Sequence, residues 1–78
     1  MINTGKLDAN RHKIYKITSE ELVLLSLAAP GIVFDDNDRH NWDYEIGTIY
    51  HYRHNDEIFL RTDGKESRRW IQLVIKDD

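Results

Sequence analysis

Residues 18–31 read TSEELVLLSLAAPG, and this stretch holds the clearest structural signals in the chain. Thr18, followed three residues later by Glu21, forms a capping box: the threonine hydroxyl accepts the Glu21 amide proton, and the glutamate carboxylate bonds back to the Thr18 amide. Pro30 disfavours the helical conformation at the residue before it, and the glycine after it permits a turn. The stretch therefore predicts a helix of about three turns over residues 19–29.

The predicted helix is apolar around most of its circumference, because Leu, Val and Ala occupy every position from 22 to 29 except Ser26. A helix that covers a core on one side needs only a one-sided apolar stripe. The additional apolar surface has two explanations: the helix lies between a sheet and the loop that follows, or its outer side contacts a partner. We expect the first in a compact domain, and the alternative is a homodimer through the helix.

Short runs of β-forming residues lie on both sides of the helix. The expected strands cover residues 12–17, 32–34, 46–54, 57–62 and 67–75. Asn55-Asp56 and Asp63-Gly64 join the last three, and these residue types tolerate the positive φ of hairpin turns. We therefore predict an α+β domain with one short helix packed on a three- to five-stranded antiparallel sheet, in the order β-α-(β)-β-β-β. A small SH3-like barrel is the alternative fold.

Length and composition limit the remaining possibilities. With 78 residues the chain is expected to form a single domain over residues 1–78, with residues 1–10 weakly ordered because they show no periodicity. Cysteine is absent, which excludes disulfides and cysteine-based zinc sites. No apolar run is long enough to span a bilayer, so we expect a cytoplasmic protein that does not associate with membranes. The net charge of −3 disfavours sequence-independent binding to duplex nucleic acid.

Residues 35–45, DDNDRHNWDYE, form an acidic segment with five acidic residues against one arginine. A connection of this length in so small a domain is typical of a functional or a disordered loop. Tryptophan and tyrosine are enriched at binding hot spots, and carboxylates complement a basic partner surface or imitate nucleic-acid phosphates. The expected partner-binding residues are Asp35, Asp36, Asp38, Trp42, Asp43, Tyr44 and Glu45. The competing interpretation is a solvated loop whose Trp42 caps the core.

Strand alternation predicts two faces for the last three strands. One face carries Tyr50 and Tyr52 with the isoleucines and leucines of the following two strands, and we expect it under the helix. The other face mixes aromatic rings with cations, as in platforms for single-stranded nucleic acid. The alternative nucleic-acid-binding residues are His51, Arg53, Phe59, Arg61, Arg68 and Trp70. The competing interpretation is that the rings are covered and the arginines are ordinary outward residues.

Metal and catalytic motifs are weak. Residues 35–38 are acidic but lack the EF-hand glycine and glutamate at their required spacing. The four histidines, at positions 12, 40, 51 and 54, are expected at the surface rather than around a zinc ion. His40 lies close in sequence to Asp38 and Asp43, yet no serine, cysteine or threonine occupies a nucleophile motif. We therefore expect no enzymatic activity, no metal and no cofactor.

Together these features predict a non-enzymatic protein-binding module that regulates or inhibits a larger partner. Small acidic chains of this kind are common among phage and mobile-element inhibitors of host nucleic-acid machinery, which motivates the idea of nucleic-acid mimicry. Direct binding of single-stranded nucleic acid through the aromatic and arginine-bearing face is the alternative.

Overall fold

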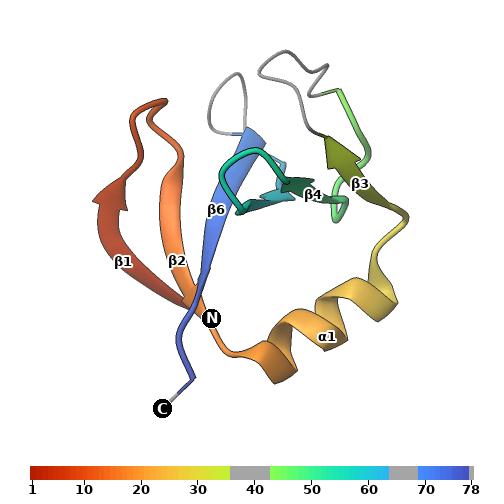
Figure 1. The fold of residues 1–78 in the computed structure, drawn as a ribbon, viewed down its shortest axis with the longest axis horizontal. Coiled ribbons are helices and arrows are strands. Elements are labelled where there is room, and N and C mark those ends of the chain that lie inside the picture. The colour runs from red at the N-terminus through yellow and green to blue at the C-terminus, as the bar shows by residue number, and fades with distance from the viewer. Residues whose placement is uncertain (36–42, 64–68, 78) are drawn as a thin grey trace.

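A computed structural model describes residues 1–35, 43–63 and 69–77 of the chain. Within these ranges the chain forms one helix and six strands (Figure 1). The elements are β1 (Ile2–Leu7), β2 (Lys13–Ile17), α1 (Ser19–Ala28), β3 (Ile32–Asp35), β4 (Ile49–Tyr52), β5 (Glu57–Arg61) and β6 (Trp70–Ile75). Among the described residues no helix has the length and apolar character needed to cross a membrane.

The helix begins as the sequence predicts. The Glu21 amide donates to the Thr18 hydroxyl at 3.1 Å, and the Thr18 amide donates to the Glu21 carboxylate at 3.1 Å, so the capping box is confirmed. The helix ends at Ala28, one residue earlier than expected, and Ala29 is already extended before Pro30.

The strands form one mixed sheet in the order β1-β2-β6-β5-β4-β3. The β2–β6 and β3–β4 pairs are parallel, and the other three pairs are antiparallel. The α+β class is confirmed, but the prediction of three to five antiparallel strands is wrong. Each parallel pair joins strands that are distant in the sequence, and local hairpin signals do not reveal such pairings.

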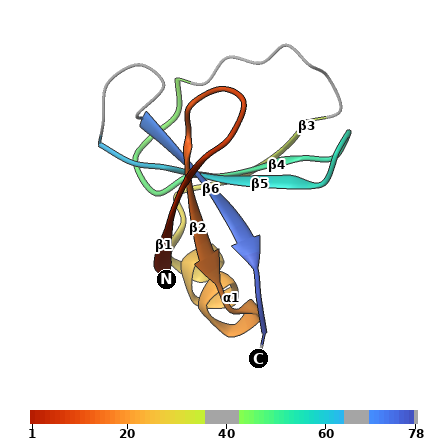
Figure 2. The same cartoon turned by 90° about the vertical axis from the view of Figure 1, so that its left-hand side faces the viewer.

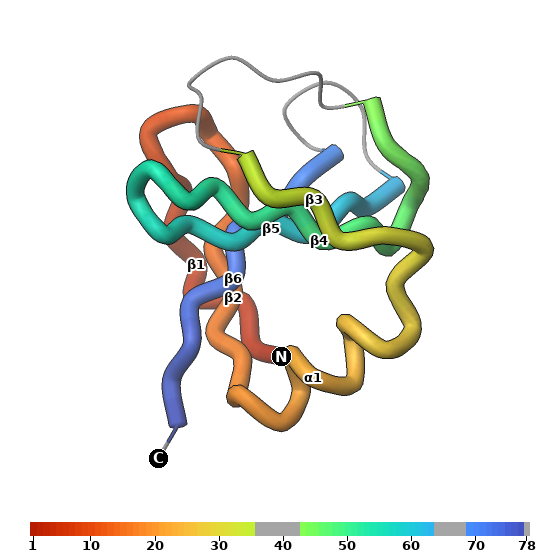
Figure 3. Tube along the Cα trace, turned by 45° about the vertical axis from the view of Figure 1, so that its right-hand side comes forward, coloured from red at the N-terminus to blue at the C-terminus, as the bar shows by residue number. Residues whose placement is uncertain are grey.

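The sheet is open and strongly twisted. In Figure 2, β1 and β2 cross β4 and β5 at a steep angle, and in Figure 3 α1 lies below β3, β4 and β5. The order begins at β1 and ends at β3, and no pairing joins these two strands in the described part of the chain. The alternative of an SH3-like barrel therefore does not describe this sheet.

Strand β1 lies within the N-terminal segment that was expected to be weakly ordered. Ile2 pairs with Lys16 and Leu7 with Lys13, and a register shift separates the two ends of β1. Asn, Gly and Lys favour strands little, so the pairing with β2, rather than local propensity, accounts for this element.

Two hydrophobic clusters occupy the opposite faces of the sheet. The aliphatic cluster consists of Ile17, Ile49, Leu60, Ile71 and Leu73, with half-buried Leu22, Leu25 and Ala29 packed against it from the helix side. The aromatic cluster consists of Tyr50, Tyr52, Phe59 and Trp70, with Val33 packed against it.

The face assignment of β4 is the opposite of the one expected. Tyr50 lies opposite Phe59, and Ile49 lies opposite Leu60, so the tyrosines belong to the aromatic cluster and Ile49 faces the helix. In β4, Ile49 and His51 alternate with Tyr50 and Tyr52, and isoleucine and tyrosine both suit a buried face. The pattern of β4 alone therefore does not determine which set faces the helix.

Candidate functional site

Three aromatic rings form a connected group where the acidic segment returns to the sheet. The Tyr44 ring centroid lies 5.9 Å from that of Tyr50 and 6.3 Å from that of Trp70, and the latter two lie 5.8 Å apart. Two of the three contacts are edge-to-face, the arrangement that aromatic pairs favour. Tyr50 and Trp70 are fully buried, whereas Tyr44 is 37% exposed. Tyr44 is therefore a surface ring supported from below by core rings.

The turn after Tyr44 holds this ring in place. The Thr48 amide donates to the Glu45 carbonyl at 3.1 Å, and the Gly47 amide donates to the Arg61 carbonyl at 2.9 Å. Gly47 has a φ of +93°, and a Cβ there would lie 3.3 Å from the Pro30 ring. Glycine suits this position because other residues rarely adopt such a φ.

Exposed acidic residues flank Tyr44 in the sequence. Asp43 and Glu45 are both exposed, on either side of Tyr44 in the sequence. The described part of the acidic segment thus presents an aromatic ring together with negative charge.

Asp35 serves the fold. Its carboxylate accepts a hydrogen bond from the Tyr50 hydroxyl, and its carbonyl accepts one from the Arg53 amide at 2.8 Å. Burial, and next the hydrogen bond to Asp35, raise the pKa of Tyr50 well above its usual range. Asp35 therefore fixes the end of β3 to the aromatic cluster. Asp36, Asp38 and Trp42, three further predicted contacts, lie outside the described residues.

The residues of the predicted nucleic-acid face do not form one exposed surface. Phe59 and Trp70 are 3% and 2% exposed, so neither ring is available to stack on a base. The competing interpretation, that these rings are covered, describes them instead: the turn carrying His12 packs on Phe59 and the segment carrying Tyr44 packs on Trp70. Arg61 is half-buried on the same side, its guanidinium 3.5 Å from the Arg69 carbonyl.

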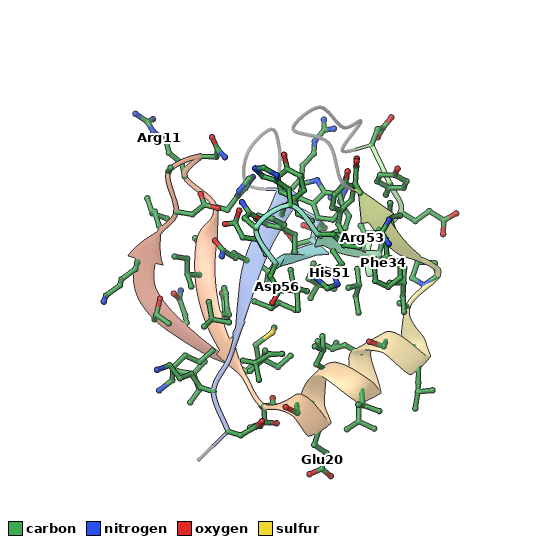
Figure 4. The ribbon with its side chains drawn as sticks, in the orientation of Figure 1. Arg11, Glu20, Phe34, His51, Arg53 and Asp56 are labelled. Atoms are coloured by element: carbon green, nitrogen blue, oxygen red, sulfur yellow. The ribbon has the colours of Figure 1, made fainter. Side chains whose placement is uncertain are left out.

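His51 and Arg53 belong to another surface. His51 lies on the helix side of the sheet, its Nε2 2.8 Å from the Asp56 carboxylate and its ring 5.4 Å from Phe34. The Arg53 guanidinium lies 5.6 Å from the Phe34 ring centroid. Figure 4 shows these four side chains together beside β3 and β4. Arg68, the remaining predicted residue, is outside the described ranges.

His12 is buried, contrary to the expectation of a surface histidine. Its Nδ1 lies 2.9 Å from the Asp8 carboxylate, its amide donates to the same carboxylate at 2.8 Å, and its ring contacts Phe59 edge-on. In the sequence, only the four-residue spacing of Asp8 and His12 around the β1–β2 turn indicates that the two side chains could pair. No group of three or more metal-ligating side chains occurs among the described residues.

Comparison with protein-family models, with curated proteins and with solved structures finds no match to this chain. The functional argument therefore depends on the site's own chemistry.

Proposed function

We propose that the chain is a non-enzymatic protein-binding module that docks the surface around Tyr44 on a basic surface of a larger protein. The supporting observation is that Tyr44 lies on two buried rings and that its two neighbours in the sequence are exposed acidic residues. A ring that is already held loses little conformational freedom on binding, so more of the contact energy appears as affinity. Tyrosine is also among the residue types enriched at binding hot spots.

The charge on this surface suggests the class of partner. Asp43 and Glu45 complement lysine and arginine on a partner, and complementary charge accelerates association and suppresses wrong partners. Proteins that handle nucleic acids carry basic surfaces of this kind. A regulator or inhibitor that occupies such a surface by mimicking nucleic acid fits this chemistry.

Binding kinetics of matched variants test the proposal. The partner is recovered from nuclease-treated lysate of the native host, purified, and measured against the wild-type chain and each variant. Tyr44→Ala should weaken binding about 30-fold, mainly through faster dissociation, as expected for a hot spot worth about 2 kcal/mol. Asp43→Asn with Glu45→Gln should slow association and reduce its salt dependence.

The control is Glu20→Gln with Asp56→Asn, which removes the same charge at exposed positions in the first turn of α1 and in the turn between β4 and β5 (Figure 4). Asparagine tolerates the positive φ of Asp56, so the turn is preserved. This control should bind like the wild type. A folded Tyr44→Ala variant with unchanged affinity, or a control that slows association as much as the test pair, would contradict the proposal.

A further inference from the structure

The outer edge of β3 carries backbone groups that do not take part in the sheet. The Gly31 carbonyl accepts from the Ile49 amide at 3.2 Å, and the Asp35 carbonyl accepts from the Arg53 amide at 2.8 Å. Because a parallel ladder uses alternate residues, Gly31, Val33 and Asp35 bond to β4. The amides and carbonyls of Ile32 and Phe34 therefore point outward. They form no hydrogen bond with any residue that the structure describes.

The opposite edge, β1, is protected against pairing. Its Gly5 amide donates to the Asn3 side chain at 2.9 Å, and its Lys6 amide lies 3.2 Å from the Thr4 hydroxyl. Gly5 has a φ of +76°, and the register shifts along the strand. Bulges and lysines are common devices that blunt sheet edges. β3 contains no lysine, proline or positive φ, so it remains a regular template for another strand.

Residues 32–34 of β3 carry apolar side chains on both faces of the sheet. Ile32 and Phe34 are 45% and 55% exposed on the helix side, and Val33 lies on the other side against the aromatic cluster. The last turn of α1 is close by in the sequence, with Leu27 80% exposed. The edge thus combines free backbone groups with uncovered apolar area.

We propose that β3 pairs antiparallel with β3 of a second copy of this chain, about a twofold axis at Val33. In this register Ile32 lies opposite Phe34 of the second copy. The amide of each residue donates to the carbonyl of the other, and the symmetric pair does the same. Four backbone hydrogen bonds thereby use all the outward groups of Ile32 and Phe34. The two Val33 residues form the non-hydrogen-bonded pair between them.

Two features favour a second copy over another extended segment. The pattern is self-complementary about one residue, as an isologous interface requires. Residues 22–34 contain no charged side chain, and the register sets Asp35 opposite Gly31 rather than opposite another acid. Two copies with a net charge of −3 each therefore meet along an uncharged stretch.

Amide hydrogen exchange of the wild-type chain tests this pairing without any mutation. The Val33 amide, which bonds to β4, should be protected at every protein concentration. The Ile32 and Phe34 amides should gain protection only as concentration rises and the chain dimerises in sedimentation. A chain that stays monomeric up to about 1 mM, the weak limit of specific association, would overturn the proposal. So would a dimer in which these two amides exchange as fast as in dilute solution.

Variants assign the dimer to the edge. Phe34→Pro removes the outward-pointing Phe34 amide, which the proposed dimer needs as a donor. An edge strand tolerates proline where its amide points away from the sheet, so the variant should fold but should not dimerise. Phe34→Ala keeps the donor but loses two cross-strand contacts, and should weaken the dimer about tenfold. Leu7→Ala, an exposed apolar residue of β1, is the matched control and should have no effect. A dimer that survives Phe34→Pro and is lost in Leu27→Glu would instead use the helix, and would overturn the proposal.

Discussion

The two faces of the sheet bury their side chains by different means. The aliphatic cluster lies under α1, yet no residue of that helix is itself fully buried. None of the described residues forms a helix over the aromatic cluster, yet Tyr50 and Trp70 are among the most buried residues that the structure describes. The β1–β2 turn that carries His12 and the segment that carries Tyr44 cover that face, and the large rings fill the space beneath them. A domain too small for a second layer of helices thus uses aromatic volume in place of that layer.

Truncating one side chain on each face of the sheet should reveal the largest difference in unfolding free energy. Trp70→Ala removes the largest fully buried side chain and should cost about 3–5 kcal/mol of unfolding free energy. Leu25→Ala removes a half-buried helix residue and should cost about 2 kcal/mol or less. Urea denaturation followed by circular dichroism measures both. Equal costs would mean that the helix carries as much of the core as the aromatic cluster.

The hydroxyl of Tyr50 adds a polar bond to the aromatic side. Tyr50→Phe removes the donor to the Asp35 carboxylate and should cost about 2 kcal/mol, as for other hydrogen bonds to charged groups. The raised pKa of Tyr50 favours the neutral form in the fold, so its stabilisation is complete below the ordinary tyrosine pKa and is lost as pH rises through the folded value. The difference in unfolding free energy between the wild type and Tyr50→Phe should therefore become smaller above about pH 10. A gap that widens there would contradict this assignment.

On the helix side of the sheet, the corresponding polar contribution to stability comes from the capping box at the start of α1. Thr18→Ala removes the acceptor for the Glu21 amide and should cost about 1 kcal/mol. Thr18→Ser keeps the hydroxyl and should cost a few tenths of a kcal/mol at most, as expected among good capping residues. Equilibrium denaturation of the two variants compares them directly. If both variants lose the same stability, the Thr18 methyl group, which both lack, rather than the capping hydroxyl accounts for the loss.

The smallest effect on stability is expected where Asp77 contacts the start of α1. The Asp77 carboxylate accepts from the Ser19 hydroxyl and from the Ser19 amide, and these bonds lower its pKa. A lowered pKa gives stability above the ordinary aspartate pKa that is lost as pH falls through the folded value. Asp77→Asn should be slightly less stable than wild type at neutral pH and equal to it in acid. A difference that stays constant as the pH falls well below the ordinary aspartate pKa would exclude this origin.

The sequence predicts what depends on neighbouring residues. The capping box and the hairpin residue Asp56, with a φ of +58°, are local features, and both appear as expected. The ends of β2, β3 and β5 lie within one residue of prediction for the same reason. Asp43 and Glu45 are exposed, and the prediction that they contact a partner stays a prediction.

The sequence does not predict what depends on distant partners. β1 exists because β2 accepts it, and the parallel pairings join segments far apart in the chain. The rings of Phe59 and Trp70 could equally have lined an open face, and only the packing of His12 and Tyr44 decides their burial. The structural role of Asp35 likewise required the register that brings Tyr50 beside it.

The place of β6 in the sheet has a consequence for synthesis on the ribosome. Of the six strands that the structure describes this one is made last, yet it lies between β2 and β5, and the Lys76 amide also bonds to the Ile17 carbonyl. Until residues 70–77 leave the exit tunnel, the two halves of the sheet have no strand to join them. The sheet therefore cannot be completed before residues 70–77 have been synthesised, and a stop codon before residue 70 should yield a chain that proteases remove.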